Sequence, residues 1–241
     1  WEIVETFYKT FNFNLKVRLS LRDPEKADSY LGEPEQWEKA QDLLREIAKE
    51  KNIETYEGVG EAAFYGPKLD FMSKDSLGRE WQVATIQFDF NMPERFDLFC
   101  INESGEQERI VMIHAAIMGS IERFMSIFIE HTAGNLPTWL APVQAAIVPI
   151  SEKQNDYAQK VMQELMAAIP DLRIEIDDRS ESMGKRIREH VTQKVPYILV
   201  VGDKEIEAGG VAVRGRGEVD LGTISIEEFK AKLSEEISTK Q

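Results

Sequence analysis

The sequence predicts an α/β protein in two parts, an α+β portion with an antiparallel sheet followed by an α/β domain with a mostly parallel mixed sheet. Residues 62–73 and 80–90 are expected to be strands joined by a turn at 75–78, an arrangement typical of antiparallel neighbours. From residue 142 onward, short apolar strands alternate with helical segments. This second pattern indicates a parallel layer covered by helices.

The other elements of the first portion follow from the spacing of apolar residues. Residues 1–10 have the periodicity of a helix, and residues 15–21 alternate as a half-buried strand does. A polar loop leads to a helix over 34–51, in which Trp37 and Leu44 face the core.

A third helix is expected to start at Ala116, because the apolar residues that follow it recur at helical spacing. Helical spacing would place Gly119, Ser120 and Arg123 on the same face as Ala116. Two interpretations of this face are open. The small residues let a neighbouring element approach closely, or they leave room for a flat ligand beside the guanidinium of Arg123.

The second portion has a regular alternation of elements. Its strands and helices are expected in chain order at 143–150, 153–169, 172–176, 183–193, 197–201 and 226–237. A hairpin is expected at 204–214, turning at Ala208-Gly-Gly210. Ser225 has the position of an N-cap for the last helix. A turn at 134–137 separates the two parts, which predicts domains at 1–137 and 138–241.

Composition limits the classes of protein to consider. A chain of 241 residues with 42% hydrophobic and 30% charged residues is typical of folded globular proteins. No signal peptide is visible at Trp1–Glu5, and no apolar run approaches the ~18 residues of a membrane span, so no membrane partner is expected. The single Cys100 favours a reducing, cytoplasmic location. The net charge of −14 means that nucleic-acid binding would need a local basic patch.

Short motifs occur in a distinctive order along nearly the whole chain. They are Phe64-Tyr-Gly-Pro-Lys68, Trp81-Gln82, Thr85-Ile-Gln87-Phe-Asp-Phe90, Pro93-Glu-Arg-Phe96, Met112-Ile-His114, Gly119-Ser-Ile-Glu-Arg-Phe124, Trp139-Leu-Ala-Pro-Val-Gln144, Val195-Pro-Tyr197 and Val200-Val-Gly-Asp-Lys204. This series resembles the class II aminoacyl-tRNA synthetases in the form found in threonyl-tRNA synthetases, and Gly119–Phe124 is similar to their third signature motif.

The resemblance implies an enzyme that activates threonine with ATP and Mg²⁺ and transfers it to threonine tRNA. It also implies that residues 1–241 are part of a longer, homodimeric protein whose first two motifs lie upstream, so this segment alone is expected to be inactive. Positioning and charge neutralisation would carry the chemistry, without a protein nucleophile. The alternative is a non-catalytic synthetase-like module that binds tRNA or threonine.

Five residues match positions that hold the substrates in the resembled family. They are Tyr65, Gln82, Gln87, Ser120 and Arg123. Gln87 and Arg123, together with Lys68, are expected to be catalytic. Strict alternation would put Gln82 and Gln87 on opposite faces of their strand, so a shared site requires a bulge or twist between them. Without the resemblance, a solvated turn at Lys68 and a structural glutamine are equally consistent with the pattern.

His114 matches a zinc ligand of the family, whose other ligands would lie upstream of Trp1. Zinc would bind the amino and hydroxyl groups of threonine, although a lone histidine is more often a polar core residue. Cys100 and His131 do not match ligand positions. Two departures are visible: Ala115 replaces a common arginine, and Val83-Ala84 replaces Cys-Gly, which predicts a narrower pocket.

The second portion carries a group of charged residues suited to RNA. Its members are Lys185, Arg186, Arg188, Lys194, Lys204, Glu205, Arg214 and Arg216. Such residues neutralise phosphates and read exposed base edges, although composition alone favours a solvated helix face for residues 184–189. By resemblance to the C-terminal anticodon-binding domain, Arg188, Glu205 and Arg214 contact anticodon bases. Ser180 stands where asparagine is usual, so its contact is expected to be weaker.

Overall fold

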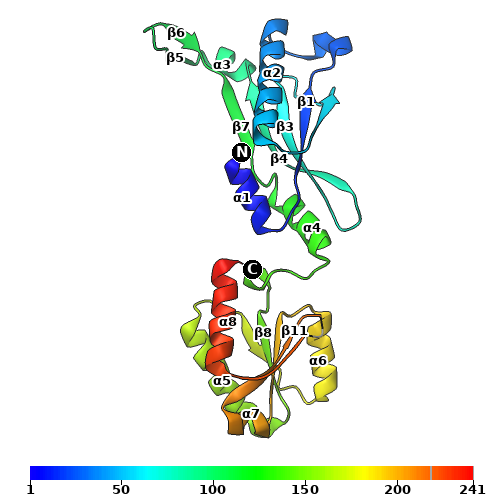
Figure 1. The fold of residues 1–241 in the computed structure, drawn as a ribbon, viewed down its shortest axis with the longest axis vertical. Helices are drawn as coiled ribbons and strands as arrows, with labels where there is room; N and C mark the ends of the chain where they lie inside the picture. Colours follow the sequence, from blue (N-terminus) through cyan, green and yellow to red (C-terminus); the bar gives the residue numbers. More distant parts are fainter. Residues whose placement is uncertain (218, 241) are drawn as a thin grey trace. The chain divides into compact units, whose positions relative to one another are not determined.

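The computed structural model describes residues 1–217 and 219–240. The chain divides into two compact units, Trp1–His131 and Thr132–Gln241, each with its own five-stranded sheet (Figure 1). The predicted α/β class with two kinds of sheet is confirmed. Among the helices of the described residues, none has the length and apolar character that a membrane crossing requires.

The sheet of the first unit has the strand order β2-β1-β3-β4-β7. Its strands are β1 (Lys16–Leu21), β2 (Thr55–Val59), β3 (Lys68–Lys74), β4 (Glu80–Asp89) and β7 (Met112–Ala116). The central pairs are antiparallel as predicted, whereas β2 joins the edge in parallel with β1. β2 carries no apolar alternation that the sequence pattern could reveal, because most of its residues are exposed.

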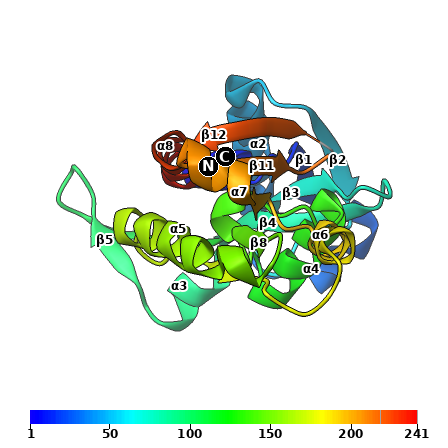
Figure 2. The same ribbon diagram turned by 90° about the horizontal axis from the view of Figure 1, so that it is seen from below.

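Helices and a short hairpin complete the first unit. The helical segments are α1 (Glu2–Thr10), the 3-10 helix η1 (Pro24–Ser29), α2 (Pro34–Lys51), α3 (Asn91–Arg95) and α4 (Ile121–Thr132). α2 has the predicted bounds because Pro34 is pre-organised for the first turn, and it buries Trp37 and Leu44. β5 (Phe99–Ile101) and β6 (Gln107–Arg109) form a hairpin that projects from this unit (Figures 1 and 2).

The prediction of a helix from Ala116 onward is wrong. Ala116 ends β7, Gly119 has a φ of 66°, and α4 starts only at Ile121. The Oγ of Ser120 accepts a hydrogen bond from the backbone N–H of Arg123 at 3.2 Å, as an N-cap does. The small residues therefore build a turn, where a positive φ favours glycine, and they form no common helix face with Arg123.

The sheet of the second unit has the strand order β12-β11-β10-β8-β9. Its strands are β8 (Ala145–Pro149), β9 (Ile174–Ile176), β10 (Tyr197–Val201), β11 (Gly210–Gly215) and β12 (Asp220–Ser225). Strands β10, β8 and β9 are parallel, and β11 and β12 are antiparallel additions, which agrees with the predicted mostly parallel mixed sheet.

Helices cover both faces of this sheet because its central strands are apolar on both sides. α5 (Asn155–Ala168) and α8 (Ile226–Thr239) pack on the face that carries Ile147 and Leu199. α6 (Met183–Thr192) packs through Ile187 on the opposite face (Figure 1). Successive strand residues point to opposite faces, so each helix layer buries alternate positions.

The predicted hairpin turn at Ala208–Gly210 is wrong. Residues Asp203–Ala208 form a short helix, α7, which ends at Gly209 with a φ of 64°. The Gly202 N–H donates to Oε2 of Glu205 at 3.0 Å, which stabilises the first turn of α7 in place of a strand. β11 therefore pairs with β10 on one side and with β12 on the other.

The N-cap of α8 gives a test of the second unit's stability. Ser225 Oγ accepts from the N–H of Glu228 at 3.1 Å, as predicted. Ser225→Ala is expected to lower the free energy of unfolding by about 1 kcal/mol, measured by calorimetry. The control is Ser234→Ala at an exposed mid-helix position of α8, where alanine is the better helix former and no loss is expected. Equal losses in both variants would contradict the capping role.

Candidate functional site

Three strands of the first unit bring polar side chains to one face of the sheet. Lys68 of β3 is paired with Gln87 of β4, and Gln87 is paired with His114 of β7. Directly paired residues on antiparallel strands share a face and lie next to each other. The register alone therefore assembles three of the predicted site residues in a row.

A bulge in β4 adds Gln82 to this face. Phe71 is paired with Ala84 and Met72 with Gln82, which leaves Val83 as an extra residue. Val83 is buried, and its carbonyl accepts a hydrogen bond of 2.7 Å from the hydroxyl of Tyr8. The bulge that a shared site for Gln82 and Gln87 requires is thus present.

A cavity of about 410 Å³ opens beside these residues. Its polar lining includes Tyr65, Thr85, Gln87, Asp89 and His114. The hydroxyl of Tyr65 donates to Oε1 of Gln87, and the amide of Gln87 donates to Thr85 Oγ1 at 3.3 Å. The rings of Tyr65 and His114 lie edge to face with centroids 6.1 Å apart. The cavity thus presents a phenol, an amide and an imidazole to a small polar ligand.

The charge state of this cavity is set by Asp89. Burial opposes ionisation, but hydrogen bonds from the Met92 N–H, His114 and the Asn91 N–H hold the pKa of Asp89 below its ordinary value. The pKa of the Tyr65 phenol is raised, first by burial and then by the charges of Asp89 and Asp70. At neutral pH the cavity therefore holds a carboxylate and a neutral phenol that is able to donate.

His114 is suited to hold a metal ion only with ligands from elsewhere. Its Nε2 lies 2.8 Å from Oδ2 of Asp89, and such a carboxylate fixes the ring of a metal-binding histidine. No group of three His, Cys, Asp or Glu side chains within residues 1–217 and 219–240 is arranged to hold a metal. Cys100 is exposed on the β5–β6 hairpin, and His131 stacks on Phe13. Among the described residues, His114 therefore can supply one ligand to a metal site whose other ligands come from elsewhere.

Arg123 and Ser120 lie apart from the cavity lining. Both residues are exposed at the start of α4, directly after the turn that follows β7. Within the described part of the chain, no hydrogen bond or ion pair occupies the guanidinium of Arg123. The group is free to bind an anion or a flat ring, while Ser120 serves as the helix cap.

Sequence reasoning did not assign Thr85 and Asp89, which are polar residues of the cavity lining, to the site. Both lie two positions from Gln87 on β4 and point to the same face. The polar residues at every second position, 85, 87 and 89, were the signal that could have identified them. Ala115, the departure noted from the sequence, also lines this cavity.

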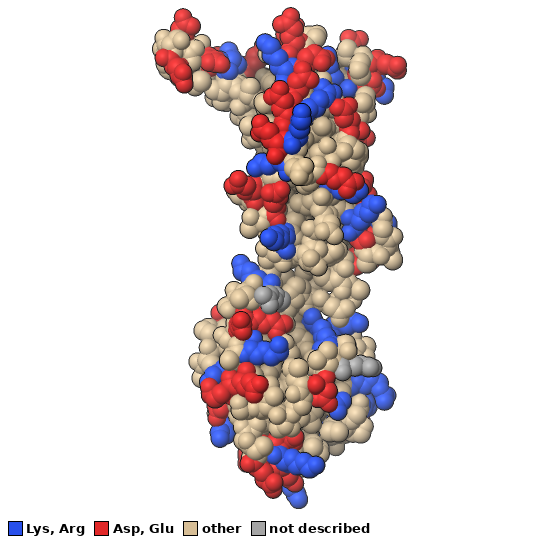
Figure 3. Space-filling model, in the orientation of Figure 1, with Lys and Arg blue, Asp and Glu red and all other residues tan. Residues whose placement is uncertain are grey.

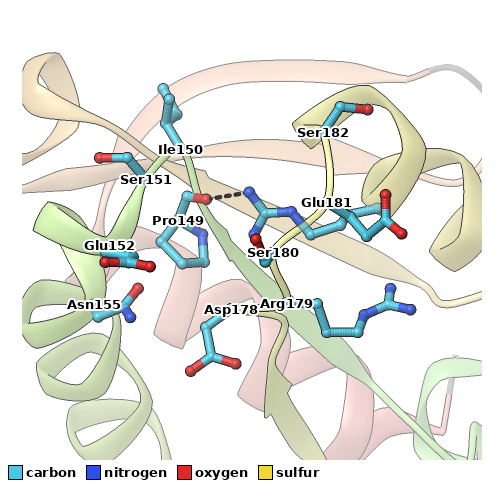
Figure 4. Close-up of a pocket in the computed structure, with 11 residues that line it drawn as sticks. Pro149, Ile150, Ser151, Glu152, Asn155, Asp178, Arg179, Ser180, Glu181 and Ser182 are labelled. Atoms are coloured by element: carbon cyan, nitrogen blue, oxygen red, sulfur yellow. Dashed lines mark hydrogen bonds between the residues drawn. The ribbon is translucent and has the colours of Figure 1, made fainter.

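A second cavity, of about 380 Å³, lies in the second unit where β8 and β9 end. Glu152 and Asn155 lie on one side of it and the segment from Asp178 to Ser182 on the other (Figure 4). Arg186 is buried, donates to the Pro149 carbonyl at 2.8 Å and also donates to the Asp177 carbonyl. The buried guanidinium therefore joins the ends of the two strands and shapes the wall that contains Ser180.

The other predicted RNA-binding residues have different environments. Arg188 on α6 and Arg214 on β11 are exposed. Glu205 is buried and accepts from the Gly202 N–H and from Thr223 Oγ1 at 3.2 Å, so it already has a structural task. Arg216 is held by backbone carbonyls. Acidic and basic side chains are interspersed on the visible face of each unit (Figure 3), so any basic patch on that face is local.

The sequence of each unit matches a known family model. Residues 1–132 match the family model described as "tRNA synthetase class II core domain (G, H, P, S and T)", and residues 144–236 match "Anticodon binding domain". The chain therefore belongs to the class II tRNA synthetase family, as its motifs predicted.

Comparison with individual proteins shows a more specific similarity. The threonine-tRNA ligase of Phocaeicola vulgatus is 50% identical over 238 residues, which is 98% of this chain and 36% of that protein. The corresponding ligase of Caldanaerobacter subterraneus is also 50% identical, and the match covers 99% of this chain and 36% of the length of that ligase. The chain thus spans about a third of these relatives. A crystal structure of the RNA binding domain of threonyl-tRNA synthetase from Cryptosporidium parvum has a TM-score of 0.83 at 33% identity, covering 97% of this chain and 57% of that one.

Acid denaturation tests the network beneath the second cavity. Hydrogen bonds from Arg179, and then from His190, lower the pKa of Asp177 to about 2 from 3.8. A depressed pKa stabilises the fold above pH 3.8, and this contribution is lost as the pH falls toward 2. We expect Asp177→Asn to lower the free energy of unfolding by about 1–2 kcal/mol at neutral pH, after allowance for the exposed Arg179.

The measurement is chemical denaturation followed by circular dichroism at several pH values. The curves of Asp177→Asn and the unmodified protein should converge near pH 2, where Asp177 itself becomes protonated. The exposed neighbour gives the control, because Asp178→Asn should leave the whole profile unchanged. A gap that is independent of pH would argue against the charge of Asp177 as the source of the stabilisation.

Proposed function

We propose that the chain is part of a threonine-tRNA ligase that activates threonine with ATP and transfers it to threonine tRNA. The single observation that carries this proposal is the cavity in which Tyr65, Gln87 and His114 converge, within a chain of the class II family. Names of the relatives support threonine as the amino acid.

The proposed reaction has two steps. The threonine carboxylate attacks the α-phosphate of ATP in line, and pyrophosphate leaves as the adenylate forms. A terminal ribose hydroxyl of the tRNA then attacks the acyl carbon, and AMP leaves. Mg²⁺ would neutralise the phosphates, and the unengaged guanidinium of Arg123 would face the nucleotide. Lys68 and Gln87 would hold the reacting groups, and Gln82 and Ser120 would contribute to substrate binding.

We also propose that His114 is one of three ligands of a zinc ion, the other two lying upstream of residue 1. Zinc supplies Lewis acidity and open coordination positions for the amino and hydroxyl groups of threonine. The Asp89–His114 pair supports this role, because it fixes the imidazole ring at the cavity. Tyr65, whose ring lies against His114, would orient the bound amino acid.

The second unit would recognise the anticodon. Ser180 at the cavity wall and the exposed Arg188 and Arg214 are accessible to unstacked bases. Glu205, on α7, would also contribute to recognition of the anticodon bases. A net charge of −14 gives no general attraction to RNA, so these local groups would carry recognition.

Further proposals concern the protein as a whole. Residues 1–137 would be the end of the catalytic domain and residues 138–241 the anticodon-binding domain. The full-length protein would be a cytoplasmic homodimer. A non-catalytic module that binds tRNA or threonine is the second candidate, and the replacement of a common arginine by Ala115 at the cavity favours it.

Pyrophosphate exchange tests the enzyme. Residues 1–241 joined to the remainder of the chain that the relatives carry should catalyse ATP-pyrophosphate exchange that depends on threonine. Arg123→Ala should lower kcat/KM roughly a hundredfold, because a cation that faces the transition-state charge is lost. Arg45→Ala, at a partly exposed arginine on α2 that is paired with Glu57, should leave the rate unchanged. Retained tRNA binding without any exchange would establish the non-catalytic module instead.

Anticodon recognition is tested separately. Arg214→Ala should weaken binding of threonine tRNA roughly tenfold at fixed salt while ATP-pyrophosphate exchange stays unchanged. Filter binding gives the Kd. The matched control is Lys160→Ala, an exposed cation on α5 at the other face of the sheet, which should not alter the Kd. Parallel losses of binding and exchange in Arg214→Ala would refute a separate role for the second unit.

A further inference from the structure

A buried carboxylate lies among the cations of the polar sheet face. Asp70, in the middle of β3, is 0% exposed. Its Oδ2 accepts from Ser20 Oγ at 2.6 Å and from Arg18 Nη2 at 3.1 Å, and it lies 3.2 Å from Nζ of Lys68. Three donors from two strands thus converge on one oxygen. A buried charge of this kind is tolerated only when it is paired.

The two cations depend on Asp70 to different degrees. Arg18 has a second ion pair with Glu61 at 3.1 Å and reaches Oε1 of Gln82 at 3.4 Å. In the described part of the chain, the ion pair with Asp70 is the only one that Lys68 makes. The Lys68 side chain is 14% exposed, so without Asp70 its ammonium would lie almost buried beside Arg18 with no opposite charge. Repulsion and desolvation would drive it toward solvent.

Asp70 is placed to act through Lys68. It has no exposed surface with which to touch a ligand, and it does not line the cavity. Lys68 is paired in the sheet with Gln87, which lines that cavity. An ammonium has three donors, and one directed at Asp70 leaves two for a bound anion.

We propose that Asp70 is a positioning residue for threonine activation, whose carboxylate holds the Lys68 ammonium beside Gln87. This inference rests on the proposed function, because it assigns Lys68 to the reacting groups. Ser20 fixes the carboxylate in turn through its hydroxyl. The flexible stem of lysine makes such a partner necessary, since four rotatable bonds otherwise spread the ammonium over many positions.

Asparagine is a suitable replacement at this position. Oδ1 of Asp70 is buried and makes no hydrogen bond to a described residue, so an amide nitrogen there would break no existing bond. The amide oxygen would keep the bond to Ser20, and only the negative charge would be lost. Ser20→Ala is a milder second variant, which removes the hydroxyl that holds the carboxylate and leaves the charge in place.

A double-mutant cycle tests the proposal in the full-length protein by threonine-dependent pyrophosphate exchange. Lys68→Met is expected to lower kcat/KM for threonine roughly tenfold to a hundredfold, as the loss of a charge-assisted hydrogen bond does. Asp70→Asn is expected to lower it roughly tenfold, and Ser20→Ala by a smaller factor. The variant with both Asp70→Asn and Lys68→Met should lose no more than Lys68→Met alone.

Asp75→Asn is the matched control. Asp75 is also buried and bonded to an arginine, Arg79, but it lies in the turn after β3, away from the polar face. It should lower the melting temperature without changing exchange. Two results would overturn the role of Asp70 without affecting the proposed function. One is a double variant whose loss of kcat/KM is the product of the two single losses, and the other is unchanged exchange in Asp70→Asn. An unmodified protein without exchange would overturn the proposed function and this inference together.

Discussion

The backbone pairing of β4 with β3 and with β7 is the constraint on which the candidate active site depends. The pairing puts Lys68, Gln87 and His114 in one row, and the bulge at Val83 adds Gln82 to it. A slip of one residue in either ladder would turn a strand's polar set to the opposite face. Hydrogen bonds between the backbones therefore decide which side chains share this face, and contacts between side chains then orient them.

Buried carboxylates bond to the charged and polar side chains that surround the two cavities. Asp89 fixes the ring of His114 at the cavity, and Asp70 pairs with Lys68 one strand away. In the second unit, Asp177 bonds Arg179 and His190 beneath the wall of the other cavity. In each case fixed donors stabilise a desolvated anion, and the anion in turn holds its cationic or neutral partner in place.

Local signals in the chain predicted much of the fold. Pro34 and the inward Trp37 defined α2, and the continuous apolar run at 197–201 defined β10 with its observed bounds. The start of α4 was misplaced, because an apolar run near Ala116 fits a strand or a helix and only pairing with β4 decides between them. The strand expected before Ala208 is instead the helix α7. The alternation of residues there was weak, and the hydrogen bond from the Gly202 N–H to Glu205 stabilises a helical turn.

The sequence by itself determined the two-part α/β class, the family motifs and most of the residue types at the site, because periodicity and motif order are properties of neighbouring positions. Tertiary structure decided which of those residues meet. It brought Thr85 and Asp89 into the cavity, left Arg123 outside its lining, and surrounded Asp70 with cations. Contacts of this kind join positions far apart in the chain, and the register that creates them arises only when whole strands pair.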